Sequence, residues 1–215
     1  MTVIITIQDP EKDVVYLGAD RMISNTVTKS VSSCPKFFKK QFNTYTAETV
    51  LNEDGSEDIV KSDVVEHYLI FAGAGSDSVN SYIQYAFRFP DKIESDTFET
   101  YLLLDLLPSI REELDAVGLM KTGDGGCNDT EANFLIIYDG QVYPVFRDLG
   151  YSPSSEEYNV IGVGSEIAYG SLYSTKELSP MERIRVAIGA CSYHCLFVDD
   201  NMDIIQITDD DYLVE

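Results

Sequence analysis

The second residue of the chain carries both groups of a nucleophile with its own base. Thr2 follows Met1, and a starting methionine is normally removed when the next side chain is this small, which leaves Thr2 with a free α-amine. Because an α-amine titrates near neutral pH, it can take the proton of the threonine hydroxyl without a histidine. A retained Met1 would turn this amine into an amide that cannot act as a base. A nucleophilic threonine is therefore predicted on the condition that Met1 is removed.

Histidine and cysteine chemistry is poorly supported by the rest of the chain. The two histidines, His67 and His194, are too few for a multi-histidine metal site. The four cysteines have neither the Cys-x-x-Cys spacing of a zinc site nor the density of a disulfide scaffold; they are Cys34, Cys127, Cys191 and Cys195. We expect reduced thiols, no bound metal and no cofactor.

Acidic side chains dominate the charge of the protein. There are 37 acidic and 15 basic residues, for a net charge of −22, which repels a phosphate backbone and argues against nucleic-acid binding. No run of about 18 apolar residues is present for a membrane span, and no basic-then-apolar signal peptide opens the chain. The acidic runs lack the ligand spacing of a calcium loop and are expected to be solvated. These features indicate a cytoplasmic protein without a membrane partner.

Length and composition favour one folding unit. The 215 residues, of which 44% are apolar, can form one sizeable core, and no linker rich in Pro, Gly or Ser divides them. We therefore predict a single domain over residues 1–215. It carries an acidic insertion at about 44–63 and an acidic tail at 208–215.

The first part of the chain reads mainly as strands. Alternating apolar residues predict strands over residues 2–8 and 14–18, joined as a hairpin, which places Thr2 at the open end of a sheet edge. Residues 25–31 and 36–42 suggest a further strand pair. Residues 43–64 read as polar and irregular, and residues 68–72 as a short buried strand.

Helices and strands then alternate in blocks. Apolar residues at helical spacing predict helices near 79–87 and 98–114, the second kinked at Pro108. Strands follow over 134–138, 141–146 and 159–162, then a helix over 165–175. A capping box, Ser179-Pro180-Met181-Glu182, starts a last helix to about Tyr193, and strands over 196–198 and 203–207 close the chain. This order predicts an α+β fold with two stacked sheets and a helix pair on each outer face, a four-layer αββα sandwich.

Several motifs in this order resemble one known family. Thr2 opens the first predicted strand, Gly18-Ala19-Asp20 ends the second, and Lys36 follows sixteen residues after Asp20. A glycine turn, Phe71-Ala72-Gly73-Ala74-Gly75-Ser76-Asp77, follows a later buried strand. With these motifs the chain resembles, over nearly its whole length, the N-terminal-nucleophile hydrolases of the proteasome β-subunit type, and most closely the HslV peptidase. By this resemblance Thr2 stands at the nucleophile, Asp20 and Lys36 at the family's aspartate and active-site lysine, and Gly73 at the oxyanion-hole glycine.

The resemblance implies a role for each of these residues. Lys36, paired with Asp20, would stay positively charged and lower the cost of forming the threonine alkoxide. The Gly73 N–H would stabilise the oxyanion, a contribution of roughly 3 kcal/mol per donor in enzymes generally. The alternative for Asp20 and Lys36 is an ordinary surface ion pair, worth about 0–1 kcal/mol.

Four further positions are candidates by the same resemblance. Asn133 stands where family members usually have a serine that supports the terminal amine, and Ser24 is a second supporting residue. Ile23 and Phe71 stand where the family shapes its substrate pocket, which indicates an apolar preference. The acidic insertion lies near the mouth of the site in this family.

As a function, the resemblance implies a threonine peptidase. It would hydrolyse peptide bonds of unfolded polypeptides inside a homo-oligomeric ring of about six or seven subunits, fed by an ATP-dependent unfoldase. Two alternatives stay open. One is a catalytically inactive structural or assembly protein that keeps Met1, and the other is an amidohydrolase in which Thr2 attacks a small non-peptide amide.

Overall fold

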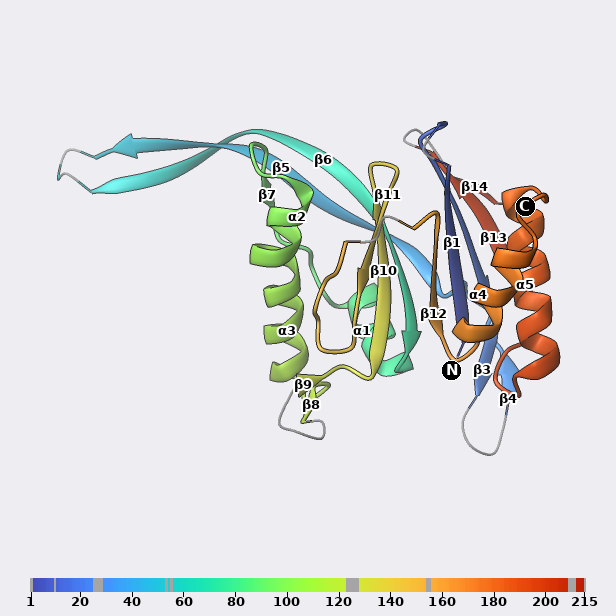
Figure 1. Cartoon of the computed structure of the whole chain (residues 1–215). Helices are drawn as coiled ribbons and strands as arrows, with labels where there is room; N and C mark the ends of the chain where they lie inside the picture. The colour runs from blue at the N-terminus through green and yellow to red at the C-terminus, as the bar shows by residue number, and fades with distance from the viewer. Residues whose placement is uncertain are drawn as a thin grey trace.

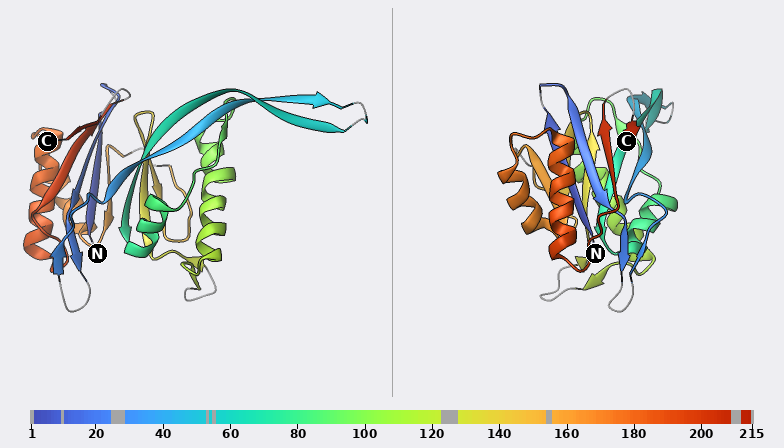
Figure 2. Two further views of the ribbon diagram at one scale, coloured as in Figure 1. Left: turned by 180° about the vertical axis from the view of Figure 1, so that it is seen from behind. Right: turned by 90° about the vertical axis from the view of Figure 1, so that its right-hand side faces the viewer.

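The computed structural model describes residues 2–9, 11–24, 29–52, 54, 56–122, 128–153, 156–208 and 212–214. Two five-stranded sheets lie face to face, and helices cover the outer face of each (Figures 1 and 2). The predicted four-layer αββα sandwich is confirmed. Residues 25–28 of a predicted strand, Cys127 and the tail acids 209–211 lie outside the described residues.

The first sheet contains the start of the chain. In spatial order its strands are β12 (Tyr158–Gly162), β1 (Val3–Asp9), β2 (Val14–Asp20), β13 (Met202–Ile207) and β14 (Tyr212–Val214). The predicted β1–β2 hairpin is confirmed. The prediction that Thr2 stands at a sheet edge is wrong, because β12 pairs with the other side of β1 and makes β1 an interior strand.

The second sheet is built around one long hairpin. Its strands, in spatial order, are β11 (Gln141–Val145), β10 (Ala132–Tyr138), β6 (Glu57–Gly75), β5 (Phe37–Leu51) and β7 (Lys92–Ile93). The predicted turn between β10 and β11 is confirmed, with Asp139 and Gly140 both at positive φ. Two small sheets, β3 (Met22–Ser24) with β4 (Lys29–Val31) and β8 (Lys121–Thr122) with β9 (Asn128–Asp129), lie outside this pair.

Helices form the two outer layers. The second sheet is covered by α1 (Asp77–Tyr85), α2 (Phe98–Tyr101), η1 (Leu102–Leu106) and α3 (Leu107–Ala116), and the first by α4 (Ser165–Ser174) and α5 (Pro180–His194). The predicted capping box at Ser179 and Glu182 is present. In place of a simple kink at Pro108, the helix contains a π-helical turn, η1, just before the proline. None of the helices in the described ranges is long and apolar enough to cross a membrane.

Three apolar layers hold these elements together. One lies between the sheets, and it includes Ile4 of β1, Ala72 of β6 and Leu135 of β10. A second joins α4 and α5 to the first sheet, and a third joins α1–α3 to the second sheet. Residues of β1 therefore pack on both sides, since Val3 and Ile5 face the helices while Ile4 faces the other sheet.

Residues 43–64 are not irregular, and this is the largest error of the sequence interpretation. Residues 43–51 and 57–64 belong to β5 and β6, which continue as a two-stranded ribbon well beyond the helical layer (Figure 1). The error arose because the segment is rich in charged side chains and its side chains are largely exposed, so it lacks the buried pattern by which strands are recognised.

Two further strand predictions are wrong. β5 pairs with β6 rather than with residues 25–31, and residues 29–31 pair with β3 instead. Residues 196–198 form a turn after α5 and not a strand. Both errors concern short segments whose partners lie elsewhere in the chain, which local sequence patterns do not reveal.

Candidate active site

The backbone around Thr2 is held by the loop that follows β12. The Val163 N–H donates to the Thr2 carbonyl at 2.8 Å. Gly162, the last residue of β12, has a φ of +101°, and a Cβ built there would lie 2.1 Å from the same carbonyl oxygen. Only glycine fits this approach without moving Thr2. Thr2 itself is only 3% exposed.

Asp20 lies at the end of β2, in contact with the Thr2 hydroxyl. The hydroxyl donates to Asp20 Oδ1. The carboxylate also accepts the backbone N–H groups of Val3, at 2.9 Å, and Met22, at 3.0 Å. Asp20 is fully buried, so these donors and a nearby cation are what stabilise its negative charge.

Lys36 supplies that cation from the segment just before β5. Its ammonium donates to Thr2 Oγ1 and to Asp20 Oδ1, the latter at 3.1 Å. The Lys36 side chain is 12% exposed and that of Asp20 is 0% exposed. The alternative of an ordinary surface ion pair is therefore wrong. Burial lowers the pKa of Lys36, and the negative charge of Asp20 opposes this shift.

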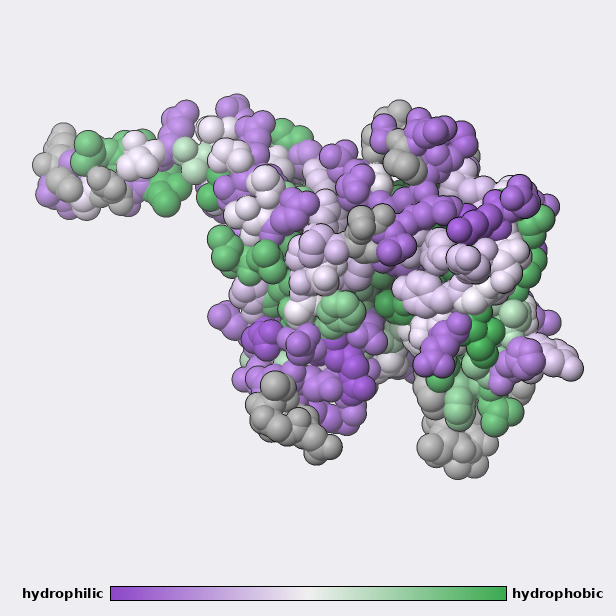
Figure 3. All heavy atoms as spheres, viewed as in Figure 1, coloured by the Kyte–Doolittle hydropathy of each residue, from purple (hydrophilic) through white to green (hydrophobic). Residues whose placement is uncertain are grey.

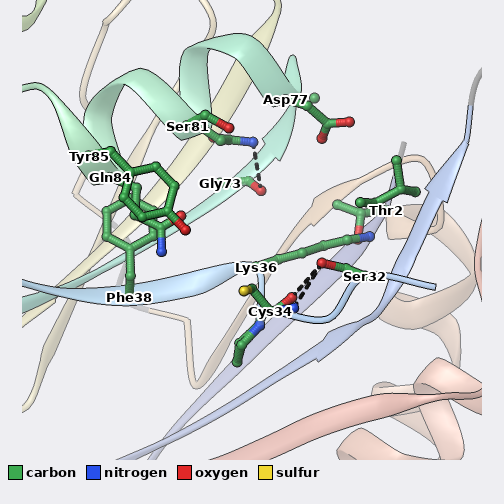
Figure 4. A pocket seen from close by; sticks show the side chains of 14 residues that line it. Thr2, Ser32, Cys34, Lys36, Phe38, Gly73, Asp77, Ser81, Gln84 and Tyr85 are labelled. Atoms are coloured by element: carbon green, nitrogen blue, oxygen red, sulfur yellow. Dashed lines mark hydrogen bonds between the residues drawn. The ribbon is translucent and has the colours of Figure 1, made fainter. Parts of the chain in front are cut away.

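A pocket of about 270 Å³ opens in front of Thr2. Figure 4 shows Lys36 extending toward Thr2, with Gln84 and Tyr85 of α1 on one side and Cys34 on the other. Besides these five, its lining consists of Ile23, Ser32, Pro35, Phe38, Gly73, Gly75, Asp77, Asn80 and Ser81. No residue of the acidic insertion lines this pocket, because β5 and β6 carry the insertion away from it. The expectation that the insertion lies near the mouth of the site is wrong.

Of the two residues predicted to shape the pocket, one lines it in the structure and the other does not. Ile23 lines the pocket, and it is 39% exposed. Phe71 does not line it, because its ring is fully buried in the layer between β6 and the helices. Phe38 takes its place and stacks on Phe71 with ring centroids 5.5 Å apart. Phe38 was missed because it reaches the site through the β5–β6 register, which local sequence patterns do not give.

Gly73 lines the pocket, but its N–H is already used. It donates to the Lys36 carbonyl at 3.2 Å, just beyond the first pair of the β5–β6 ladder. The Gly73 carbonyl accepts the side-chain amide of Asn80 at 3.2 Å, and a Cβ on Gly73 would collide with that amide. The predicted oxyanion donor thus lies at the pocket, and its N–H is already paired in this conformation. Asn80, one turn into α1, was not singled out from the sequence.

The structure does not bring the two supporting candidates onto Thr2. Asn133 lies on β10 opposite Ala74, and no hydrogen bond joins it to Thr2 among the described residues. Ser24 ends β3, and its buried hydroxyl has no partner within the described part of the chain. Over the same residues, no cluster of three or more His, Cys, Asp or Glu side chains could hold a metal ion.

Comparison with known proteins supports the fold and gives no match in sequence. The sequence matches no protein-family model and no curated protein. Among solved structures, BPH of Thiobacillus denitrificans in complex with epoxomicin has a TM-score of 0.66 at 11% identity, covering 98% of this chain and 100% of that one. Another structure of the same BPH has a TM-score of 0.64 at 13% identity, covering 97% and 98%.

HslV from Trypanosoma brucei extends this likeness. Its TM-score is 0.54 at 13% identity, and the match covers 96% of this chain and 99% of that one. These structures match almost end to end at identities too low to carry more than the fold. The chain therefore has the αββα fold of the proteasome-type N-terminal-nucleophile hydrolases, as the sequence motifs predicted.

Proposed function

We propose that the protein is a threonine peptidase whose nucleophile is Thr2 after removal of Met1. The observation that carries this proposal is the contact of one hydroxyl with two buried charged groups. Thr2 Oγ1 donates to Asp20 and accepts from Lys36, at the wall of a pocket that opens to solvent. A structural threonine has no need of a buried carboxylate and a buried lysine on the same oxygen, since both charges are costly to bury.

In the proposed reaction the threonine oxygen attacks the carbonyl carbon of a peptide bond. The proton of the Thr2 hydroxyl passes to a base, the new O–C bond forms, and the C–N bond breaks as the leaving nitrogen takes up that proton. Water then hydrolyses the ester and restores Thr2. Asp20 holds the lysine and the hydroxyl in line throughout.

Lys36 is one proton acceptor within reach of the hydroxyl, and it acts as a base only in its neutral form, because the ammonium donates to Thr2 Oγ1. It is in direct hydrogen-bond contact with Thr2 Oγ1, and its lowered pKa favours the neutral amine more than in a solvent-exposed lysine. This differs from the sequence expectation that Lys36 acts only as a fixed positive charge. The α-amine of Thr2, once freed, is the second base available to the same oxygen.

Stabilisation of the oxyanion requires a small rearrangement. The Gly73 N–H would have to leave the Lys36 carbonyl and turn toward the substrate. This bond lies just outside the Phe37–Ala72 pair that ends the β5–β6 ladder, so breaking it leaves the ladder intact. A substrate oxygen that carries developing charge is a stronger acceptor than a neutral carbonyl, which favours the exchange.

The proposed substrate is a polypeptide with an apolar side chain before the cleaved bond. Ile23, Phe38 and Tyr85 supply the apolar part of the pocket. We also propose a homo-oligomeric ring that acts in the cytoplasm on chains unfolded by an ATP-dependent partner. The support for the ring and for this partner is the likeness in fold to HslV.

The test combines the mass of the N-terminus with a covalent probe. Epoxomicin, the ligand of the similar BPH structure, should add to Thr2 through both its hydroxyl and its amine, and peptide mapping should find the adduct on the first residue. Thr2→Ala should abolish the adduct and the hydrolysis of fluorogenic peptides with an unchanged melting temperature, because only a few atoms are lost. Unchanged turnover by Thr2→Ala would rule out the mechanism.

One observation favours the inactive alternative. The Gly73 N–H is paired with Lys36, so the site as described offers the expected oxyanion donor no free hydrogen. A uniformly retained Met1 in the protein from its native source, together with failure of epoxomicin to react, would favour a structural role on the same fold.

A further inference from the structure

The β5–β6 ribbon ends in an arm that pairs with no other strand. We define the arm as residues 46–51 and 57–62, whose strands pair only with each other. Pairing of β5 with β7 stops at Tyr45, and pairing of β6 with β10 starts at Ile70. Six paired residues at about 3.3 Å each give a projection of roughly 20 Å. Both outer edges of the arm therefore carry open backbone groups (Figure 1).

Apolar side chains occupy both faces of this arm. Val50 and Val60 share one face and are 44% and 46% exposed, and Leu51 and Ile59 share the other and are 70% and 71% exposed. Figure 3 shows hydrophobic residues along it. A strand pair with one face in water normally keeps that face polar, and a two-stranded hairpin alone is marginally stable. Glu48 and Asp58 share the face of Val50 and Val60, so that face is mixed. The face of Leu51 and Ile59 exposes the larger apolar surface and has the pattern of a surface that a partner covers.

The root of the arm fixes its direction. The Thr46 hydroxyl donates to Glu94 at 2.9 Å, and Lys61 forms an ion pair with Asp91 at 2.7 Å. The Lys61 ammonium also lies 4.3 Å from the centre of the Tyr45 ring. These contacts tie both strands of the arm to the segment around β7. The arm is thus held out from the body.

A basic pocket on the body has the opposite charge to the tip of the arm. Its volume is about 480 Å³, its lining includes Lys39, Lys40 and Arg88, and no acidic residue lines it. We call it the basic pocket. Arg88 is exposed and makes no hydrogen bond or ion pair with the described residues. The Lys40 ammonium lies in this pocket and donates to the carbonyls of Gln84 and Phe87, whereas Lys39, the next residue of β5, places its ammonium over the Tyr68 ring on the opposite face of the strand. Two cations without a carboxylate in one pocket are an exception in a chain with 37 acidic and 15 basic residues.

The tip of the arm presents carboxylates to solvent. Asp54 and Asp58 are exposed there. The tip cannot reach the basic pocket of its own chain, because both lie along β5. From Asn43, in the pocket, to Leu51, next to the tip, eight residues of strand span about 26 Å. A contact between the two can form only between different molecules.

We propose that the arm docks on a second copy of this chain, with its acidic tip at the basic pocket and its apolar residues covered by the surface beside it. Arm and pocket are different surfaces, so the contact is heterologous and repeats from copy to copy, closing a ring or extending a filament. The apolar residues supply most of the stability and the charges fix the register. This inference rests on the proposed assembly and is independent of the Thr2 chemistry.

The first test removes the apolar contact. Sedimentation velocity of the full chain at micromolar concentration should show oligomers, and the double variant Leu51→Ser/Ile59→Ser should raise the dissociation constant at least about tenfold. The matched control is Leu103→Ser/Leu104→Ser, which removes two leucines of comparable exposure, 49% and 70%, from the helical layer. Equal weakening by both pairs, or by neither, would overturn the proposal.

The second test uses the head-to-tail geometry. Arg88→Glu reverses a charge in the basic pocket and leaves the arm unchanged. Leu51→Ser/Ile59→Ser removes the apolar side chains of the arm and leaves the basic pocket unchanged. At a protein concentration between the wild-type dissociation constant and the raised one, each variant alone should be monomeric, and a one-to-one mixture should form dimers that do not grow further. Combining Asp58→Arg with Arg88→Glu in one chain should restore the oligomers. A mixture that stays monomeric would contradict the docking mode.

Failure of this inference can be told apart from failure of the proposed function. Oligomers that are insensitive to all these variants would exclude the arm and leave the proposed ring in place. A wild-type chain that is monomeric at every salt concentration would exclude both. Epoxomicin labelling of Thr2 reports on the catalytic chemistry separately, since no residue of the arm lines the pocket in front of Thr2.

Discussion

Replacing Gly162 by alanine should move the proposed nucleophile without touching its side chain. A Cβ at this position would lie 2.1 Å from the Thr2 carbonyl oxygen, whereas ordinary contacts begin at about 3.4 Å. The difference, 3.4 − 2.1 = 1.3 Å, is the distance by which β12 and Thr2 must separate. The same carbonyl accepts the Val163 N–H at 2.8 Å, so this hydrogen bond would be strained as well.

The expected effects on rate and stability follow from this displacement. A misplacement of about 1 Å in a catalytic group can cost about 100-fold in rate, so kcat/KM should fall by about that factor. Alanine at a φ of +101° adds strain of roughly 1–3 kcal/mol. For a chain of this length, each kcal/mol lowers the melting temperature by about 2–4 °C.

The control is Gly170→Ala, which adds the same methyl group at a helical position with no atom within 4 Å of the new Cβ. It should leave kcat/KM unchanged and raise stability slightly, since alanine is favoured over glycine in helices. Fluorogenic peptide hydrolysis and thermal melting of both variants provide the readout. If Gly162→Ala behaves like Gly170→Ala, then the position of Thr2 does not depend on β12 and the reasoning is refuted.

Further predictions concern charge. Lys36→Met should lower peptide turnover by orders of magnitude. It should also lower the free energy of unfolding, measured with denaturant, by up to about 3 kcal/mol, because Asp20 stays buried without its cation. Loss of stability without loss of activity would contradict the mechanism. Burial lowers the pKa of Lys36, so at pH values just below 10.5 the folded protein has released this proton while the unfolded chain still holds it. Over that pH range the free energy of unfolding of the wild type, relative to that of Lys36→Met, should rise with pH. Parallel pH profiles of the two proteins would contradict this prediction. Assembly should be weaker at about 10 mM than at 150 mM salt, because the net charge of −22 is less screened, and light scattering at the two salt concentrations measures this.

The layered fold and the contact of Asp20 and Lys36 with Thr2 could be predicted because their signals are local. Gly18-Ala19-Asp20 and Lys36 lie close in sequence to the strands that position them, and the structure brings Asp20 and Lys36 onto Thr2. The apolar stripe of the helix region 98–114 is buried as its spacing predicted. Capping and turn chemistry also act within a few residues, which is why the start of α5 was predicted correctly.

What could not be predicted depends on contacts between distant segments. β12 follows β1 by about 150 residues, so its place beside Thr2 has no local signature. Phe38 lines the pocket because β5 and β6 pair in the register that places it opposite Phe71. Whether the Gly73 N–H is free or paired depends on the position of the Lys36 carbonyl on the neighbouring strand. The arm was missed for a different reason, since its residues alternate toward two faces and none of residues 46–51 and 58–62 is buried in this chain.

The long β5–β6 ribbon links these results, because it carries the proposed catalytic and assembly features at opposite ends. Lys36 and Gly73 lie at one end, and the arm forms the other. Between them, residues 70–72 of β6 pair with both neighbouring strands and Leu69 packs in the core, and the ion pair of Lys61 with Asp91 anchors the root of the arm. Substitutions at the arm tip therefore do not touch residues 69–72 of β6 or the Lys61–Asp91 ion pair. We expect arm variants to alter assembly while leaving the Lys36–Thr2 contact in place, so the two proposals can be tested independently in one protein.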